Sequence, residues 1–220
     1  MRSQRGRLAA FLSMGLLCLV LLTGVLCYYV SVPIYQSLCF ELGCLGGIAP
    51  ARAFPIRDLL LDESDLPLDW QVRGEPHHPE YRLPAEQIAL TFGIDDCGPY
   101  SLGASHSVCR FVDGIASASY GYRYKTSIWF APGAGLGPWH APAELAYESP
   151  VADQYRFQCA VYSGSTRRTC QAVGQYEEYL VRFHTTIDPD HPRCMSFSDL
   201  ESILVTIDER MAFYLGKDPQ

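Results

Sequence analysis

The chain has 220 residues, of which 24 are acidic and 17 basic, giving a formal net charge of −7 at pH 7, and 48% are hydrophobic. This length suits one ordinary domain, and it is too short for two large domains once a membrane segment is subtracted. The 18 glycines and 15 prolines form no repeat, and no stretch is polar enough for a disordered protein, which excludes collagen-like, low-complexity and disordered classes.

An uncharged run near the N-terminus predicts a transmembrane helix. Residues 8–30 follow Arg2, Arg5 and Arg7 and contain no charged side chain. At 1.5 Å per residue, such a run spans roughly the 30 Å hydrocarbon core of a bilayer. A cleaved signal peptide is the competing interpretation, but its apolar part is only about 7–15 residues long and is followed closely by a small-residue cleavage site. The run ends in bulky residues instead, so we expect a retained anchor.

The charges around this run predict its orientation. No Lys or Arg follows until Arg52, so the positive-inside rule places residues 1–7 in the cytoplasm and the rest of the chain outside the membrane. The outer part keeps all 24 acids but only 14 of the 17 bases, a formal charge of −10. Such an acidic domain repels nucleic acid and anionic lipid headgroups. We therefore expect contact with the bilayer through residues 8–30, and no nucleic-acid partner.

The outer part divides into a connector and one folded domain. Residues 31–53 are apolar and contain several glycines, which predicts a juxtamembrane connector, whereas residues 54–217 have the composition of a globular domain. Apolar and polar side chains alternate in residues 87–92, 155–161 and 179–187. This alternation is typical of half-buried strands.

Residues 115–130 fit two periodicities. Every second side chain is apolar with one exception, which predicts a strand. The i, i+4 series of Ala116, Tyr120, Tyr124 and Ile128 predicts a helix instead. A strand of this length would exceed the usual five or six residues. The pattern leaves both structures open.

The clearest element is a C-terminal helix. Ser198 and Glu201 fit a capping box at its start, and Gly216 suits a left-handed residue at its end. Together with the strands, this helix predicts an α+β domain, in which a mainly antiparallel sheet carries a C-terminal amphipathic helix on one face. The apolar residues at helical spacing are Leu200, Ile203, Leu204, Ile207, Met211 and Tyr214.

Seven of the nine cysteines lie outside the predicted membrane span. In an oxidising compartment this density predicts disulfides, and the absence of a Cys-x-x-Cys pair excludes zinc ribbons and thioredoxin-type sites. The spacing predicts the pairs Cys159–Cys170, across a hairpin that turns at residues 163–165, and Cys97–Cys109. The pairing of three others stays open: Cys39, Cys44 and Cys194.

The sequence DDCGPYSL at residues 95–102 resembles the nucleophile motif of the bacterial cysteine peptidases that trim double-glycine leader peptides. In that family the cysteine starts a helix and a later histidine acts as the base. The resemblance implies a papain-like peptidase with Cys97 as nucleophile and His184, 87 residues later, as base. Two features depart from the family. A polar segment follows the motif, and Gln87 lies ten positions before the cysteine, too far for the oxyanion glutamine.

A second resemblance covers more of the chain. A single N-terminal span, the sequence DESDLPLDW at residues 62–70, a cysteine-bearing hairpin and a closing helix look like uncharacterised bacterial extracytoplasmic domains. Some of these are loosely similar to ligand-sensing ectodomains of membrane kinases. The resemblance implies an extracytoplasmic location and leaves the ligand unknown.

The remaining candidates for a site are few. The adjacent His77 and His78 lie in a Pro-rich loop without a carboxylate cluster, so we expect a solvated loop and no metal. Trp139, in the Gly/Pro-rich residues 131–142, is a candidate binding residue, although such a tryptophan often packs at the edge of a core. We predict a membrane-anchored extracytoplasmic binding or sensing module that is not an enzyme, uses no cofactor and binds an unknown ligand or protein. The alternative is the peptidase.

Overall fold

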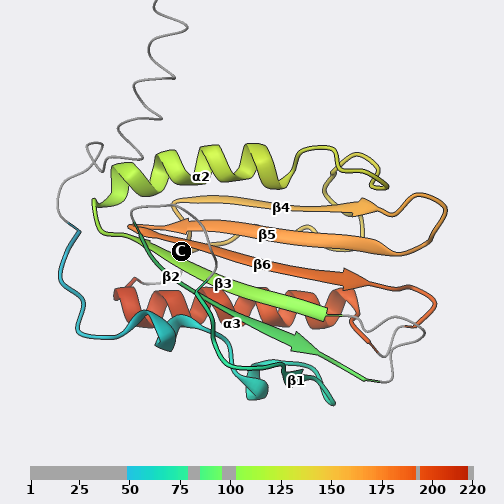
Figure 1. Cartoon of the computed structure of the whole chain (residues 1–220), viewed down its shortest axis with the longest axis horizontal. Helices are drawn as coiled ribbons and strands as arrows, with labels where there is room; N and C mark the ends of the chain where they lie inside the picture. The colour runs from blue at the N-terminus through green and yellow to red at the C-terminus, as the bar shows by residue number, and fades with distance from the viewer. Residues whose placement is uncertain (1–48, 79–84, 96–102, 192–193, 218–220) are drawn as a thin grey trace, which may run out of the picture.

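The computed structural model describes residues 49–78, 85–95, 103–191 and 194–217 (Figure 1). The predicted cytoplasmic tail, the predicted transmembrane helix and most of the predicted connector precede these ranges. Within the ranges, no helix combines the length and the apolar character that crossing a membrane requires.

An antiparallel sheet forms the centre of the described domain. Its six strands lie in the order β1-β2-β3-β6-β5-β4, and every neighbouring pair is antiparallel (Figure 1). This arrangement confirms the predicted α+β class with an antiparallel sheet. The strands are β1 (Gln71–Val72), β2 (Ala85–Gly93), β3 (Gly103–Phe111), β4 (Gln154–Val161), β5 (Arg168–Tyr176) and β6 (Tyr179–Ile187).

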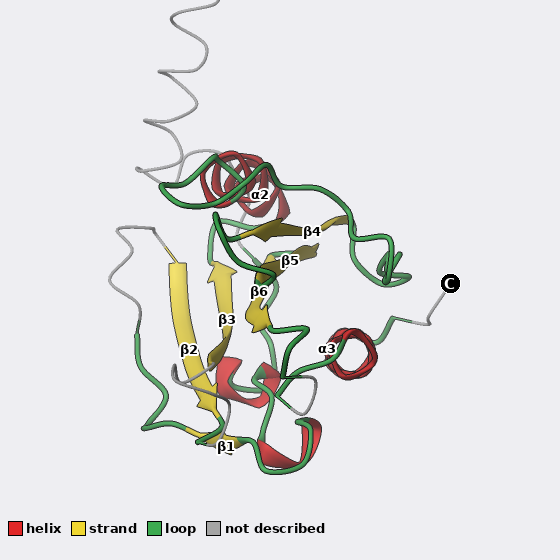
Figure 2. Ribbon diagram, turned by 90° about the vertical axis from the view of Figure 1, so that its right-hand side faces the viewer, coloured by secondary structure: helices red, strands yellow, loops and turns green. Residues whose placement is uncertain are grey.

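Helices α2 (Ile115–Trp129) and α3 (Phe197–Leu215) lie on opposite sides of the sheet, as the view along the helices shows (Figure 2). Consecutive strand residues point to opposite faces, and Ala172 and Val173 accordingly belong to two different hydrophobic cores. The core on the α3 side is the larger and includes residues of the first of two short 3-10 helices. These are η1 (Ile56–Leu59) and η2 (Glu63–Asp65).

The start of α3 differs from the prediction by two residues. The Ser196 hydroxyl accepts a hydrogen bond from the Asp199 N–H at 3.1 Å, and the Asp199 carboxylate accepts one from the Ser196 N–H at 2.8 Å. The predicted capping box at Ser198 and Glu201 is therefore wrong. The earlier box is used because it keeps Phe197 in the helix, where its ring packs against the larger core. At the other end, Gly216 has a φ of 65°, which confirms the predicted left-handed cap.

Of the two structures that the pattern of residues 115–130 allows, the helix is the one that forms, as α2. Gly114 precedes it with a φ of 91°, a conformation that favours glycine. On the inner side, a methyl group at Gly121 would overlap the ring of Phe111. The small residues of the segment thus let a helix approach the sheet closely. A strand in this segment would not need small residues at these positions.

Segments outside the strands pair with both edges of the sheet. His77 pairs with Ala89 of β2, on the side where β1 also lies, and His140 pairs with Cys159 of β4. The His140 segment therefore acts as a short additional strand along part of β4.

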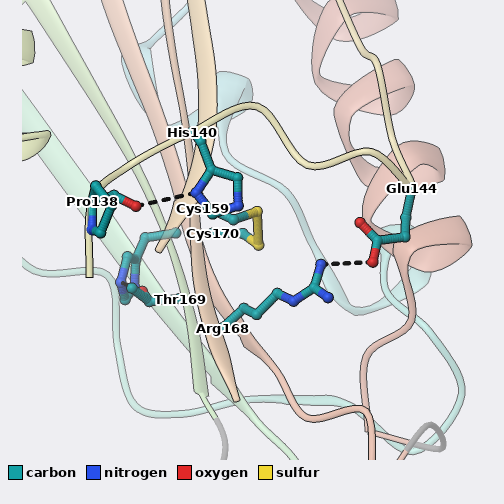
Figure 3. The surroundings of a disulfide bond; sticks show 8 residues. Pro138, His140, Glu144, Cys159, Arg168, Thr169 and Cys170 are labelled. Atoms are coloured by element: carbon teal, nitrogen blue, oxygen red, sulfur yellow. Dashed lines mark hydrogen bonds and ion pairs between the residues drawn. A yellow bond between two sulfur atoms is a disulfide. The ribbon is translucent and has the colours of Figure 1, made fainter. Parts of the chain in front are cut away.

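The predicted disulfide between Cys159 and Cys170 is confirmed (Figure 3). The two residues lie directly opposite each other in β4 and β5, with their Cα atoms 4.1 Å apart. The backbone N–H and C=O of Cys159 bond to His140, at 2.9 and 3.0 Å, rather than to Cys170. Facing pairs that exchange no backbone hydrogen bonds bring their side chains closest together, so this register favours a cross-strand bond.

A buried ion cluster holds the first described residues against the sheet. Glu178, at the turn between β5 and β6, is 0% exposed and accepts hydrogen bonds from Nε and Nη2 of Arg52 at 2.8 and 2.7 Å. Arg110 lies 3.6 Å from the same carboxylate, and its Nη2 donates to the Pro50 carbonyl at 2.6 Å. The Ala49 N–H donates to a carbonyl in the turn before α2, at 3.0 Å. The end of the predicted connector therefore packs against the domain.

We expect the disulfide to stabilise the domain measurably. Removing both sulfurs with Cys159→Ala and Cys170→Ala should lower the free energy of unfolding by about 3 kcal/mol, the value expected for closing a loop of this size. Denaturant titration of the full chain without reductant measures the loss. Cys109→Ala is the control, because it removes a free thiol and no bond. Equal losses in the two variants would contradict the prediction.

The buried histidine of the larger core should make stability depend on pH. His106 is 0% exposed, and its Nδ1 accepts a hydrogen bond from the Leu61 N–H at 3.1 Å. Burial, and to a smaller extent the charge of Arg210, lowers its pKa from 6.5 to about 3. Between these values the unfolded chain binds the proton more readily than the folded one. The contribution of neutral His106 to the free energy of unfolding is therefore complete above pH 6.5 and is lost as the pH falls towards 3.

In this window, we expect the free energy of unfolding to fall by up to about 1.4 kcal/mol per pH unit because of this one histidine. His106→Asn keeps an acceptor near the Nδ1 position but does not titrate. Urea titrations between pH 4 and 7 should show a shallower pH dependence for this variant than for the wild type. The same slope in both proteins would exclude His106 as the cause.

Candidate functional site

His184, the base of the alternative peptidase, lies in the middle of β6. Its Nε2 shares a hydrogen bond of 2.8 Å with the Thr169 hydroxyl on β5. Burial, with a smaller contribution from the charge of Arg182, lowers the pKa of His184 to about 4. This imidazole is neutral at pH 7 but a weak base, below the range that suits general-base catalysis. Cys97 lies outside the described residues, so the catalytic pair stays a prediction.

Cys109 does not form the second predicted disulfide. It carries a free thiol, partly buried on β3 beside the smaller core under α2. Burial raises its pKa to about 12, against a small opposing effect of Lys125. The Cys97–Cys109 pairing is therefore wrong, because closeness in sequence did not account for the orientation of this side chain beneath α2. Cys194 is disulfide-bonded, and its partner lies outside the described residues.

Trp139 is at the edge of the smaller core. Its ring meets Phe130 edge-on, with centroids 5.2 Å apart, and its Nε1 donates to the Ala131 carbonyl at 3.1 Å. These contacts close the loop after α2 onto the end of the helix. Its role as a binding residue stays a prediction.

A polar cluster beside α3 was not predicted from the sequence. Asp208 is 3% exposed and accepts hydrogen bonds from the hydroxyls of Tyr147, Ser149 and Tyr176 at 2.5, 2.7 and 2.6 Å. Burial and the Asp208 carboxylate together raise the pKa values of both tyrosines. The signal in the sequence was a carboxylate placed one position after Ile207 within an otherwise apolar helix face.

Next to this cluster lies a small cavity of about 10 Å³, the space of about one water molecule. Its lining is mostly apolar, and the buried hydroxyl of Tyr155 has no hydrogen-bond partner among the described residues. The volume is below the roughly 300–1,000 Å³ of small-molecule sites. The cavity and the Asp208 hydrogen bonds therefore suit the packing of α3 better than the binding of a ligand. The lining residues are Tyr155, Ala172, Gly174, Tyr176, Val181, Phe183, Leu204 and Ile207.

Helix α2 has an unusual distribution of side chains. Ile115, Tyr124 and Ile128 are 52%, 44% and 49% exposed, and Val112, in the turn before the helix, is 47% exposed. These are four of the eight large hydrophobic side chains that are exposed in the described part of the chain. We call the surface formed by Val112, Ile115, Ala116, Arg123, Tyr124 and Ile128 the outer face of α2.

The inner side of α2 carries mostly small and polar residues, together with the ring of Tyr122. Among its buried residues are Ser117, Gly121, Lys125 and Thr126. Thr126 satisfies its hydroxyl by donating to the Tyr122 carbonyl at 2.7 Å, and the Lys125 ammonium lies 5.8 Å from the ring centre of Trp129. The helix therefore packs on the sheet through small side chains, the ring of Tyr122 and local polar contacts. The stripe that sequence periodicity marks as the apolar face of a helix points largely outwards.

Comparisons with known proteins give one distant structural match. No family model matches the sequence, and no curated protein matches it. The fold is similar to the extracellular domain of PknH from Mycobacterium tuberculosis, with a TM-score of 0.48 and 10% sequence identity. The match covers 74% of this chain and 100% of that chain.

The state of Cys109 can be tested by alkylation. With a pKa of about 12, its thiol is almost wholly protonated at pH 8. Iodoacetamide should therefore label it at least tenfold more slowly in the folded chain than after unfolding in guanidinium, without reductant in either case, because the thiolate is the nucleophile. Peptide mass spectrometry measures both rates. If Cys109 stays unlabelled in the unfolded, unreduced chain, it is bridged after all.

Proposed function

We propose that this protein is a membrane-anchored extracytoplasmic binding module, not an enzyme, and that it binds through the outer face of α2. The observation that carries the proposal is that this helix exposes several large apolar side chains to solvent while it buries mostly small and polar ones. Exposed apolar surface is unfavourable in water by roughly 25 cal/mol per Å². Monomeric proteins scatter such residues singly, whereas a cluster marks an interaction site.

The anchoring part of the proposal is supported by the sequence and by the disulfide between Cys159 and Cys170. Residues 8–30 are long and apolar enough to span a bilayer, and the preceding arginines favour an outer location for the domain. The Cys159–Cys170 disulfide suits an oxidising compartment.

The pKa of His184 does not favour the peptidase alternative. The base of a cysteine peptidase needs a pKa near the working pH. His184, the base of the peptidase alternative, has a pKa lowered to about 4. The described residues thus add no support to the peptidase alternative.

Photochemical crosslinking in native membranes tests the binding surface. A benzoylphenylalanine in place of Ile128 should form several-fold more adducts of any kind than one in place of Val205. Val205 is the matched control, because it is 40% exposed on α3, across the sheet from α2. Equal yields at the two positions would refute a special binding role for the outer face.

A further inference from the structure

We infer that the outer face of α2 binds the lipid–water interface of the membrane to which the chain is anchored. The inference rests on the proposed function, because it names what this face binds. It follows from three observations: where the chain enters the domain, which side chains the face carries, and where the acidic residues lie.

The chain enters the domain beside the start of α2. The Ala49 N–H donates to the Val112 carbonyl at 3.0 Å, and Val112 is part of the outer face. The ion cluster of Arg52, Glu178 and Arg110 fixes this entry point on the sheet. The predicted span therefore leads to the end of the domain at which α2 begins.

The tether keeps the bilayer within reach of this face. Residues 31–48 join the predicted span to Ala49 and contain a single charged residue, Glu41. Even fully extended, they reach only about 60 Å. A tethered surface meets its partner at a high effective concentration, so a modest apolar contact is enough for binding.

The side chains of the face match the chemistry of a membrane interface. Tyrosine and tryptophan are enriched at the headgroup level, and helices that lie there combine apolar residues with Arg or Lys. The outer face has Ile115, Tyr124 and Ile128 around the exposed Arg123. Trp129, at the end of the helix, is partly exposed.

The acidic residues are segregated from this helix. Residues 114–143 contain no Asp or Glu, although the part of the chain after the predicted span has a formal charge of −10. Arg123 and Lys125 are the basic residues in the same stretch. Repulsion between an acidic protein and anionic headgroups, expected from the total charge, is therefore weakest at α2.

A second copy of the chain fits this face less well. A helix of 15 residues is about 22 Å long and about 10 Å wide. It offers far less than the roughly 800 Å² per partner of a stable protein interface. A symmetric contact centred on α2 would also place two Arg123 side chains near each other. A lipid surface needs no such matching area.

Reconstituted vesicles test the inference. The full chain, with benzoylphenylalanine in place of Ile128, is inserted into vesicles of phosphatidylcholine, with or without 30% phosphatidylglycerol, and illuminated. Mass spectrometry then counts phospholipid adducts. We expect at least fivefold more lipid adducts than with the probe in place of Val205. Equal yields, or a crosslinked protein dimer as the main product, would overturn the inference.

A charged residue introduced on the outer face tests whether this face binds the lipid or only lies near it. Ile115→Glu in the chain with the probe at position 128 should reduce lipid adducts about tenfold, whereas Val205→Glu should leave them unchanged. Both positions are exposed, so neither variant disturbs a core. Unchanged adducts in Ile115→Glu would count against the inference.

The outcomes also distinguish this inference from the proposed function. If the probe at position 128 captures a protein in native membranes but no lipid in vesicles, the binding function stands and its lipid partner is wrong. If it captures nothing in either system, both proposals fail.

Discussion

The buried carboxylate of Glu178 is the constraint on which the arrangement of this domain depends. A fully buried charge is strongly unfavourable unless it is paired and hydrogen-bonded. Arg52 and Arg110 meet that requirement from two distant parts of the chain, one at the end of the predicted connector and one at the end of β3. The same ion cluster therefore joins the entering chain, the hairpin of β5 and β6, and the end of β3.

The two faces of the sheet are built differently, and this difference leaves α2 available for binding. On the α3 side, aromatic and aliphatic residues form the larger core. Asp208 bonds the helix to β5 through Tyr176, and to the loop before β4 through Tyr147 and Ser149. On the α2 side, the contact uses small residues and a few rings. The α3 side thus supplies most of the apolar burial that stabilises the fold, and the exposed apolar residues on the outer face of α2 contribute little to it.

Features that depend on local periodicity were predictable from the sequence. Alternation identified the strands of the hairpin, and helical spacing identified α3, because each pattern is set by neighbouring residues. The Cys159–Cys170 disulfide was predictable because a hairpin places those residues opposite each other.

Features that depend on distant contacts were not predictable. Arg52 and Glu178 are 126 residues apart, and no local pattern relates them. The orientation of α2 depends on the fit of Gly121 against Phe111. The spacing of apolar residues along the helix carries no information about this contact. Cys97 and Cys109 were paired from spacing alone, whereas the direction of the Cys109 side chain is decided by β3 and by the helix above it.

The pairing of extra segments with the edges of the sheet has a consequence for the membrane anchoring that we propose. Domains tethered to a surface meet one another often, and an open edge strand invites a neighbour to extend the sheet. Here β1 and His77 occupy the β2 edge, and His140 occupies one end of β4. Arg156, in the remaining part of β4, turns its charge inwards over the ring of Phe130, 4.3 Å from the ring centre. Inward-pointing charges on edge strands oppose such stacking, so these domains can stand close together without polymerising through their backbones.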